Sequence, residues 1–102
     1  MGRLTTHVLD TALGCPGAGI RITLYRNLGE RYALVKDAVT NADGRCDVPL
    51  LEGAAFSAGR YRLVFAAGDY FVASGAMVAD PPFIDMVVLD FGVADSNAHY
   101  HV

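Results

Sequence analysis

The sequence has no run of about 18 consecutive apolar residues, the length that a membrane-spanning helix requires. It also has no surplus of positive charge, since eight lysines and arginines stand against eleven aspartates and glutamates, for a formal net charge of −3. The basic residues are scattered along the chain instead of forming a cluster. These absences argue against a membrane protein and against a nucleic-acid-binding protein.

Cysteine is scarce, with Cys15 and Cys46 as its two positions. The opening residues 1–4 lack the apolar run of a secretory signal peptide. Disulfide bonds persist mainly in exported proteins. We therefore expect two free thiols and a cytoplasmic protein.

The length of 102 residues fits one domain with a modest hydrophobic core. Apolar residues make up 53% of the chain and charged residues 19%, a balance that excludes a disordered protein. Part of the apolar surplus is available to cover a subunit interface. We expect a single domain over 1–102.

Several segments alternate between two faces with the period of two that strands require. In the first segment Leu4, Thr6 and Val8 share one face and Thr5, His7 and Leu9 share the other, and alternation recurs over 20–26, 32–40 and 60–66. Turn signals recur at intervals typical of a sandwich of short strands. The pattern predicts an all-β fold, an antiparallel two-sheet β-sandwich, with one short helix over 69–74.

The segment 83–91 is almost continuously apolar and follows Pro81 and Pro82, which favour an extended entry. A strand of this composition is typically covered on both faces. We expect one face to lie in the core and the other to contact a partner subunit.

All three histidines and one arginine stand in three polar clusters, which cover residues 4–10, 41–47 and 99–102. Imidazole is suited to moving protons near neutral pH, and arginine is a permanent cation with planar donors for an anionic oxygen. His99 and His101 are two residues apart, so in a strand both project from one face. These groups favour hydrolysis of a small, flat, anionic molecule, with a histidine activating water and Arg45 holding the anion.

Other interpretations of the same residues stay open at this point. Three histidines suffice for a catalytic zinc site with a metal-bound water. We favour metal-free catalysis, because zinc would leave no histidine to transfer protons and would repel a neighbouring Arg45. Taken singly, His7 is a surface residue, Arg45 a solvated turn residue, and the histidine pair part of a rim or an interface.

Other polar residues have structural interpretations. We expect Asp10 and Asp43 to cap turns and Tyr70 to pack in the core or in a lid. Cys46 has no partner base in the sequence, which argues against a thiol nucleophile.

Taken together, the clusters resemble the transthyretin-related family of 5-hydroxyisourate hydrolases, which act in urate breakdown. The matching motifs are Leu4-Thr5-Thr6-His7-Val8-Leu9-Asp10, Gly14-Cys15-Pro16-Gly17, Thr40-Asn41-Ala42-Asp43-Gly44-Arg45-Cys46, Gly68-Asp69-Tyr70-Phe71, Pro81-Pro82-Phe83 and His99-Tyr100-His101-Val102. They follow the family's order and span essentially the whole chain. The resemblance implies a transthyretin-type sandwich that assembles as a homotetramer, a dimer of dimers, with active sites in the channel between dimers.

The resemblance also implies a reaction and a set of site residues. The reaction is hydrolysis of 5-hydroxyisourate to 2-oxo-4-hydroxy-4-carboxy-5-ureidoimidazoline, without a cofactor. The catalytic set falls on His7, Arg45 and His101, and His99 is a bystander. A non-catalytic transthyretin-like carrier and a structural adhesion domain are the alternatives, and neither has a reason to keep these three residues together.

Members of the family continue past the His-Tyr-His strand into a further strand that ends in Tyr-Arg-Gly-Ser. The present sequence stops at Val102. We therefore expect that the last strand is missing and that the 102-residue chain assembles more weakly than a tetrameric full-length form, because an unpaired edge strand is a liability.

Overall fold

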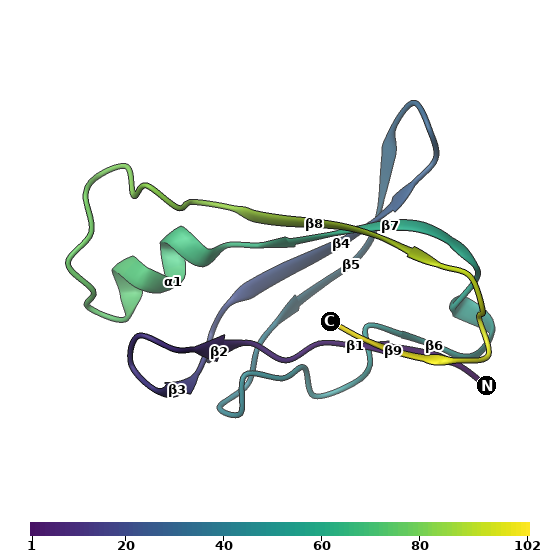
Figure 1. Cartoon of the computed structure of the whole chain (residues 1–102), viewed down its shortest axis with the longest axis horizontal. Coiled ribbons are helices and arrows are strands. Elements are labelled where there is room, and N and C mark those ends of the chain that lie inside the picture. The colour runs from purple at the N-terminus through teal and green to yellow at the C-terminus, as the bar shows by residue number, and fades with distance from the viewer.

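The computed structural model describes residues 1–102 as a sandwich of short strands with one helix (Figure 1). Its elements are β1 (Arg3–Thr5), β2 (Leu9–Asp10), β3 (Cys15–Pro16), β4 (Arg21–Asn27), β5 (Tyr32–Val39), β6 (Leu51–Glu52), the 3-10 turn η1 (Gly53–Ala55), β7 (Gly59–Phe65), α1 (Ala67–Ala73), β8 (Val87–Val93) and β9 (His99–His101). One sheet has the order β6-β1-β9 and the other the order β5-β4-β7-β8, while β2 and β3 form a separate hairpin. The predicted two-sheet β-sandwich with one short helix is confirmed, and no helix is long and apolar enough to span a membrane.

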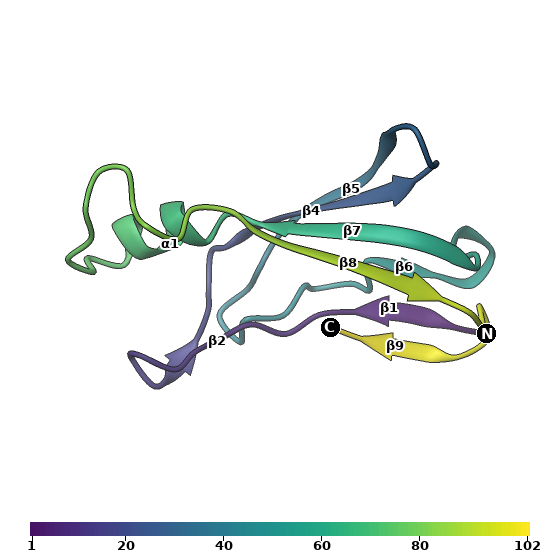
Figure 2. The ribbon, with the colours of Figure 1, turned by 45° about the horizontal axis from the view of Figure 1, so that its top comes forward.

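The pairing of β1 with β9 departs from the predicted antiparallel pattern. These strands run parallel, with Leu4 opposite Tyr100 and Thr5 opposite His101, whereas every other strand pair is antiparallel. Figure 2 shows β1 and β9 side by side. The two strands come from opposite ends of the chain, so no hairpin constrains their direction.

The predicted strand over 83–91 is wrong at its start, because β8 begins only at Val87 and continues to Val93. Phe83 is 98% exposed and lies outside the hydrophobic core. The carbonyl of Asp85 accepts a hydrogen bond from the amide of Gly68 at the start of α1 (2.7 Å). This bond ties the segment to the helix instead of to a sheet. Val88 and Leu89 remain 46% and 41% exposed, so coverage by a partner stays a prediction.

Two other boundaries differ from the predictions. The helix begins at Ala67, two residues before the predicted start, and ends at Ala73. The first alternating segment is interrupted between β1 and β2, where His7 forms an isolated bridge to Arg45.

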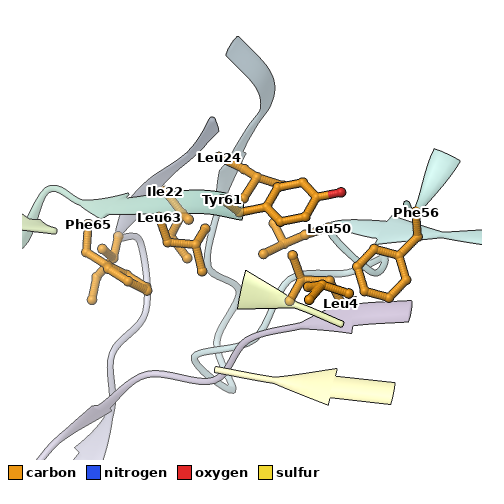
Figure 3. Close-up of a cluster of buried hydrophobic side chains, with 10 residues drawn as sticks. Leu4, Ile22, Leu24, Leu50, Phe56, Tyr61, Leu63 and Phe65 are labelled. Carbon is orange, nitrogen blue, oxygen red and sulfur yellow. The ribbon is translucent and has the colours of Figure 1, made fainter. Parts of the chain in front are cut away.

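The core lies between the two sheets (Figure 3). Leu4 of β1 is fully buried and belongs to the same cluster as Leu24 of β4 and Leu63 of β7, which are also fully buried. Burial of one such side chain contributes about 1.5–3 kcal/mol. Tyr61 is 1% exposed, and its hydroxyl donates to the carbonyl of Ser57 (2.6 Å), which satisfies the polar tip of the buried ring.

A buried carboxylate fastens α1 to the β2–β3 hairpin. Asp10 Oδ1 accepts hydrogen bonds from the amides of Ala12 (3.0 Å) and Leu13 (3.1 Å), so the predicted turn-capping role of Asp10 is confirmed. Its Oδ2 accepts a hydrogen bond from the Tyr70 hydroxyl (2.7 Å), and Tyr70 also packs against the core as predicted. The hydroxyl holds the pKa of Asp10 below its usual value, and the carboxylate raises the pKa of Tyr70 to about 12.

We expect Tyr70→Phe to lower stability at pH 7, because Asp10 then loses the hydrogen bond that favours its ionised form. The pKa of Asp10 is depressed in the folded state, so this stabilisation is present above the ordinary value of 3.8 and is lost as the pH falls through the folded value. Urea unfolding at several pH values should show a gap between variant and wild type that narrows in acid. The wild type should also lose stability between pH 10 and pH 12 as Tyr70 ionises.

The matched control is Tyr25→Phe, which removes a hydroxyl that makes no hydrogen bond within the chain. A Tyr70→Phe gap that does not change with pH would contradict the coupling to Asp10.

Candidate active site

The outer face of the β6-β1-β9 sheet carries the predicted histidine pair. Along β1, Leu4 is buried in the core and Thr5 points outward, as the period of two requires. Along β9, Tyr100 packs against the core, and its neighbours His99 and His101 are exposed on the opposite face. The prediction that the two histidines share one face is confirmed.

Thr5 joins the two imidazoles. Its Oγ1 lies 2.9 Å from His99 Nε2 and 2.8 Å from His101 Nδ1. The rings approach edge to face, with centroids 6.4 Å apart. The Nδ1 atom of His101 is therefore engaged, and Nε2 is the ring nitrogen that remains for a ligand.

A tight turn over 41–45 presents Arg45. The side-chain Oδ1 of Asn41 accepts hydrogen bonds from the backbone amides of Asp43 (2.9 Å) and Arg45 (3.2 Å). The backbone amide of Asn41 donates to the carbonyl of Arg45 (2.7 Å). Gly44 in this turn has a φ of +75°, where glycine is favoured. The predicted capping role of Asp43 is wrong, since the side chain that caps this turn is that of Asn41.

His7 lies against the same turn. It forms an antiparallel bridge with Arg45, and residues directly opposite in such a pair project from the same face. Its Nε2 lies 3.0 Å from the carbonyl oxygen of Asp43. A carbonyl only accepts hydrogen bonds, so Nε2 carries the proton and Nδ1 of the neutral ring keeps its lone pair.

A cavity of about 240 Å³ opens on the outer face of the β6-β1-β9 sheet. Its lining consists of Arg3, Thr5, Thr6, Arg45, Cys46, Val48, His99 and His101. The structure therefore brings Arg45 and His101 together in one cavity. His7 lines an adjoining, mostly apolar hollow of about 260 Å³ that also includes Leu89 and Val102.

The lining of the 240 Å³ cavity is positively charged. It includes two guanidinium groups, of Arg3 and Arg45, and no carboxylate, and neither arginine forms an ion pair within the chain. Fixed cations in a recess attract and orient an anion. Burial raises the pKa of the Cys46 thiol, which keeps it protonated and argues against a nucleophilic role.

The side chains present do not form a metal-binding group. No cluster of three or more histidine, cysteine or acidic side chains lies close enough together to hold an ion. The ring of His7 is turned toward the 41–45 turn, while His99 and His101 share Thr5. Cys15 and Cys46 are free thiols. Metal-free catalysis stays a prediction.

Sequence reasoning gave no site role to five residues of the cavity, which are Arg3, Thr5, Thr6, Cys46 and Val48. The alternating pattern of residues 4–9 predicted that Thr5 shares a face with His7. This was the one feature of the sequence that linked Thr5 to the site. Its contact with β9 depends on which distant strand pairs with β1, and the spacing along one strand does not give that partner.

We expect Gly44→Ala to destabilise the protein. A Cβ at Gly44 would lie 2.3 Å from the carbonyl oxygen of Val8, in addition to the cost of a φ of +75°, which is about 1–3 kcal/mol for a residue other than glycine. Gly19→Ala is the matched control, because Gly19 has a φ of +74° and no atom within 4 Å of the added Cβ. Urea unfolding should show a larger loss for Gly44→Ala. Equal losses would show that contact with Val8 does not restrict this turn.

Comparison with known proteins places these residues in a family. The model of the HIUase/Transthyretin family matches residues 4–102. The 5-hydroxyisourate hydrolase of Pseudomonas aeruginosa is 57% identical over 102 residues, an alignment that covers 100% of this chain and 81% of the relative.

Solved structures agree with the match. The crystal structure of (S)-allantoin synthase superposes with a TM-score of 0.91 at 43% identity and covers 98% of this chain, which spans only 38% of that longer chain. The 5-hydroxyisourate hydrolase of Klebsiella pneumoniae gives a TM-score of 0.78 at 31% identity, with coverage of 99% and 85%. Transthyretin from Sparus aurata gives the same TM-score at 22% identity, with coverage of 89% and 75%, which establishes the fold alone. The chain belongs to the HIUase/Transthyretin family.

Proposed function

We propose that this chain is a hydrolase that converts 5-hydroxyisourate to 2-oxo-4-hydroxy-4-carboxy-5-ureidoimidazoline. The observation that carries the proposal is the placement of Arg45 and His101 in one carboxylate-free cavity, with His7 bridged to Arg45 at its side. A relative named as this hydrolase is 57% identical over the whole chain, whereas the transthyretin match is 22% identical. These identities favour the enzyme over the carrier.

The reaction consumes one water and opens the six-membered ring of the substrate. The water oxygen forms a bond to the ring carbonyl carbon, the bond from that carbon to the ring nitrogen breaks, and the nitrogen takes up a proton. The carbonyl carbon becomes the carboxylate of the product, with release of the remaining proton. A base must therefore take a proton from the water, and an acid must supply one to the departing nitrogen.

The imidazoles of His7 and His101 are the groups that we assign to these proton transfers. Each has one ring nitrogen engaged by the protein, His7 through Nε2 and His101 through Nδ1, which leaves Nδ1 of His7 and Nε2 of His101 for water and substrate. Arg45 holds the anionic substrate and stabilises negative charge that develops at the attacked carbonyl. The base must be neutral to accept a proton from water, so we expect the rate to fall in acid.

We further infer a homotetramer, a dimer of dimers, with the sites at the interface between dimers. The site faces the outside of the single chain, with Arg45, His99 and His101 exposed, whereas catalysis benefits from exclusion of water. Strand β8 is one of the two edge strands of its sheet, and an exposed edge is a template for pairing with a second chain. Val88 and Leu89 on this strand are large apolar residues that remain accessible.

We expect His101→Ala to lower kcat by about 10²–10⁴-fold, since it removes a group that transfers a proton in the transition state. Arg45→Gln should raise KM as well as lower kcat, since it removes the cation that binds the anionic substrate. Uricase acting on urate generates 5-hydroxyisourate in the assay, and decay of the ultraviolet band of 5-hydroxyisourate gives the rate. The assay contains EDTA, because the proposed mechanism needs no metal.

The matched control for Arg45→Gln is Arg31→Gln, at an exposed position that is not part of the cavity, and its rate should equal that of the wild type. Full activity of His101→Ala, or loss of wild-type activity on chelation with recovery on addition of zinc, would overturn the proposed mechanism. Unchanged decay with the wild-type protein would favour the carrier.

We expect Val88→Lys to weaken assembly, because like charges would meet where two β8 edges pair. Val88 lies opposite Val64 on the outer face of the sheet and is 46% exposed, so the single chain should tolerate the change. The control is Val39→Lys on β5, the other edge of the same sheet, where Val39 is 60% exposed. Light scattering should give a smaller particle for Val88→Lys alone. A fully active monomer of the wild type in dilute solution would contradict sites at an interface.

A further inference from the structure

The Thr5 hydroxyl occupies a position that its role in the fold does not explain. The backbone of Thr5 pairs within the sheet, and its side chain projects outward, away from the core that Leu4 enters. Yet Oγ1 lies within hydrogen-bonding distance of two imidazole nitrogens, His99 Nε2 at 2.9 Å and His101 Nδ1 at 2.8 Å. A single side-chain hydroxyl therefore links the proposed proton-transfer residue to the histidine beside it.

Proton counting restricts how these three groups can bond. A hydroxyl has one proton to donate and two lone pairs to accept with, and a neutral imidazole has one donor and one acceptor nitrogen. Thr5 can therefore donate to at most one of the two rings, and each ring to which it does not donate must donate to Thr5. If Thr5 donates to His101 Nδ1, the proton of His101 sits on Nε2, which is then unable to accept a proton from water. If Thr5 donates to His99 Nε2, His101 donates through Nδ1 and its Nε2 keeps a lone pair.

We propose that Thr5 is a positioning residue that holds His101 in the tautomer with a bare Nε2, because its hydroxyl donates its hydrogen bond to Nε2 of His99 and accepts one from Nδ1–H of His101. This inference rests on the proposed function for its catalytic meaning. It also gives His99, which the family resemblance marks as a bystander, the role of accepting that hydrogen bond. Both residues act through His101 and need not touch the substrate.

The arrangement also suits the protonated state of His101. When Nε2 takes a proton, Nδ1–H continues to donate to Thr5 Oγ1, so the imidazolium keeps its hydrogen bond without a change of ring orientation. Hydrogen bonds from a charged donor are stronger than neutral ones. The oxygen of Thr5 adds no negative charge to the cavity that must bind an anion, unlike a carboxylate in the same position.

Substitutions at Thr5 separate this role from packing. Thr5→Val keeps the branched shape and removes the hydroxyl, whereas Thr5→Ser keeps the hydroxyl and removes the methyl group. We expect Thr5→Val to lower kcat by about 10–100-fold, by analogy with the loss of a group that orients a metal-bound histidine in other proteins, with KM within about 2-fold. Thr5→Ser should retain most of the wild-type kcat. A packing role would give the opposite order.

The control for loss of a strand hydroxyl is Thr23→Val on β4. Thr23 is half-buried like Thr5, and its hydroxyl donates to Asp37, remote from the site (3.2 Å). The kcat of Thr23→Val should equal that of the wild type.

Substitutions at His99 test the acceptor of the Thr5 hydrogen bond. The side-chain amide oxygen of His99→Gln can accept from Thr5, and the side chain of His99→Leu cannot. We expect His99→Leu to lower kcat and His99→Gln to restore part of it.

A spectroscopic measurement decides the tautomer independently of the reaction. Nitrogen-15 NMR of labelled imidazole side chains, at a pH where the rings are neutral, distinguishes a proton on Nδ1 from a proton on Nε2. We expect the Nδ1–H form for His101 in the wild type and in Thr5→Ser, and a shift toward the Nε2–H form in Thr5→Val. Urea unfolding verifies that each variant is folded under the conditions used.

The outcomes separate the two proposals. An Nε2–H tautomer for His101 in the wild type would overturn the role of Thr5 whether or not the chain is a hydrolase. If the chain is a hydrolase, equal kcat values for Thr5→Val and the wild type would also overturn it. Absence of hydrolysis together with the expected tautomers would overturn the proposed function and leave the positioning of His101 intact.

Discussion

The parallel pairing of β1 with β9 is the interaction on which the rest of the site depends. The amide of Val102 donates to the carbonyl of Thr5 (2.9 Å), and the amide of His7 donates to the carbonyl of Val102 (3.0 Å), so the ladder continues past both named strands. The buried Thr6 hydroxyl donates a second hydrogen bond to the same Val102 carbonyl (2.7 Å). Parallel neighbours require a long connection, and here that connection is nearly the whole domain. The histidines of β9 therefore reach Thr5 only when the sandwich has closed.

Alternation along β1 serves the core and the site at once. Leu4 and Thr6 are 0% and 3% exposed, whereas Thr5 between them faces the cavity. A slip of one residue in strand register would turn Thr5 inward and Leu4 outward. Burial of Leu4 in the core therefore also fixes which face carries the cavity. The same reasoning applies to β9, where Tyr100 packs against the core and its two neighbours form the histidine pair.

Local pattern predicted the features that depend on neighbouring residues along the chain. The shared face of His99 and His101 and the tight turn before Arg45 follow from strand periodicity and from the conformational freedom of glycine. The pattern did not predict the pairing of β1 with β9, which depends on residues almost a whole chain apart, and therefore it did not predict the role of Thr5. The prediction of a strand from Phe83 was wrong for a related reason. Hydropathy shows that a residue is apolar, but it does not show whether a neighbouring strand is available for pairing. His7 was expected on the outer face. Its backbone bridges to Arg45, and the residue lines a separate hollow next to the cavity that holds Arg45 and His101.

No carboxylate orients the imidazoles of His7 and His101, and the negative charge of the proposed substrate gives a reason for this. In many hydrolases an acidic side chain orients a histidine and stabilises its protonated form. Here the backbone carbonyl of Asp43 accepts a hydrogen bond from Nε2–H of His7, and in our proposal the Thr5 hydroxyl accepts one from Nδ1–H of His101. Both orienting oxygens are uncharged, so the field of Arg3 and Arg45 in the cavity is not cancelled before an anion enters. In our proposal the turn that carries Arg45 also supplies the carbonyl that orients His7, so a change in that turn should affect anion binding and proton transfer together.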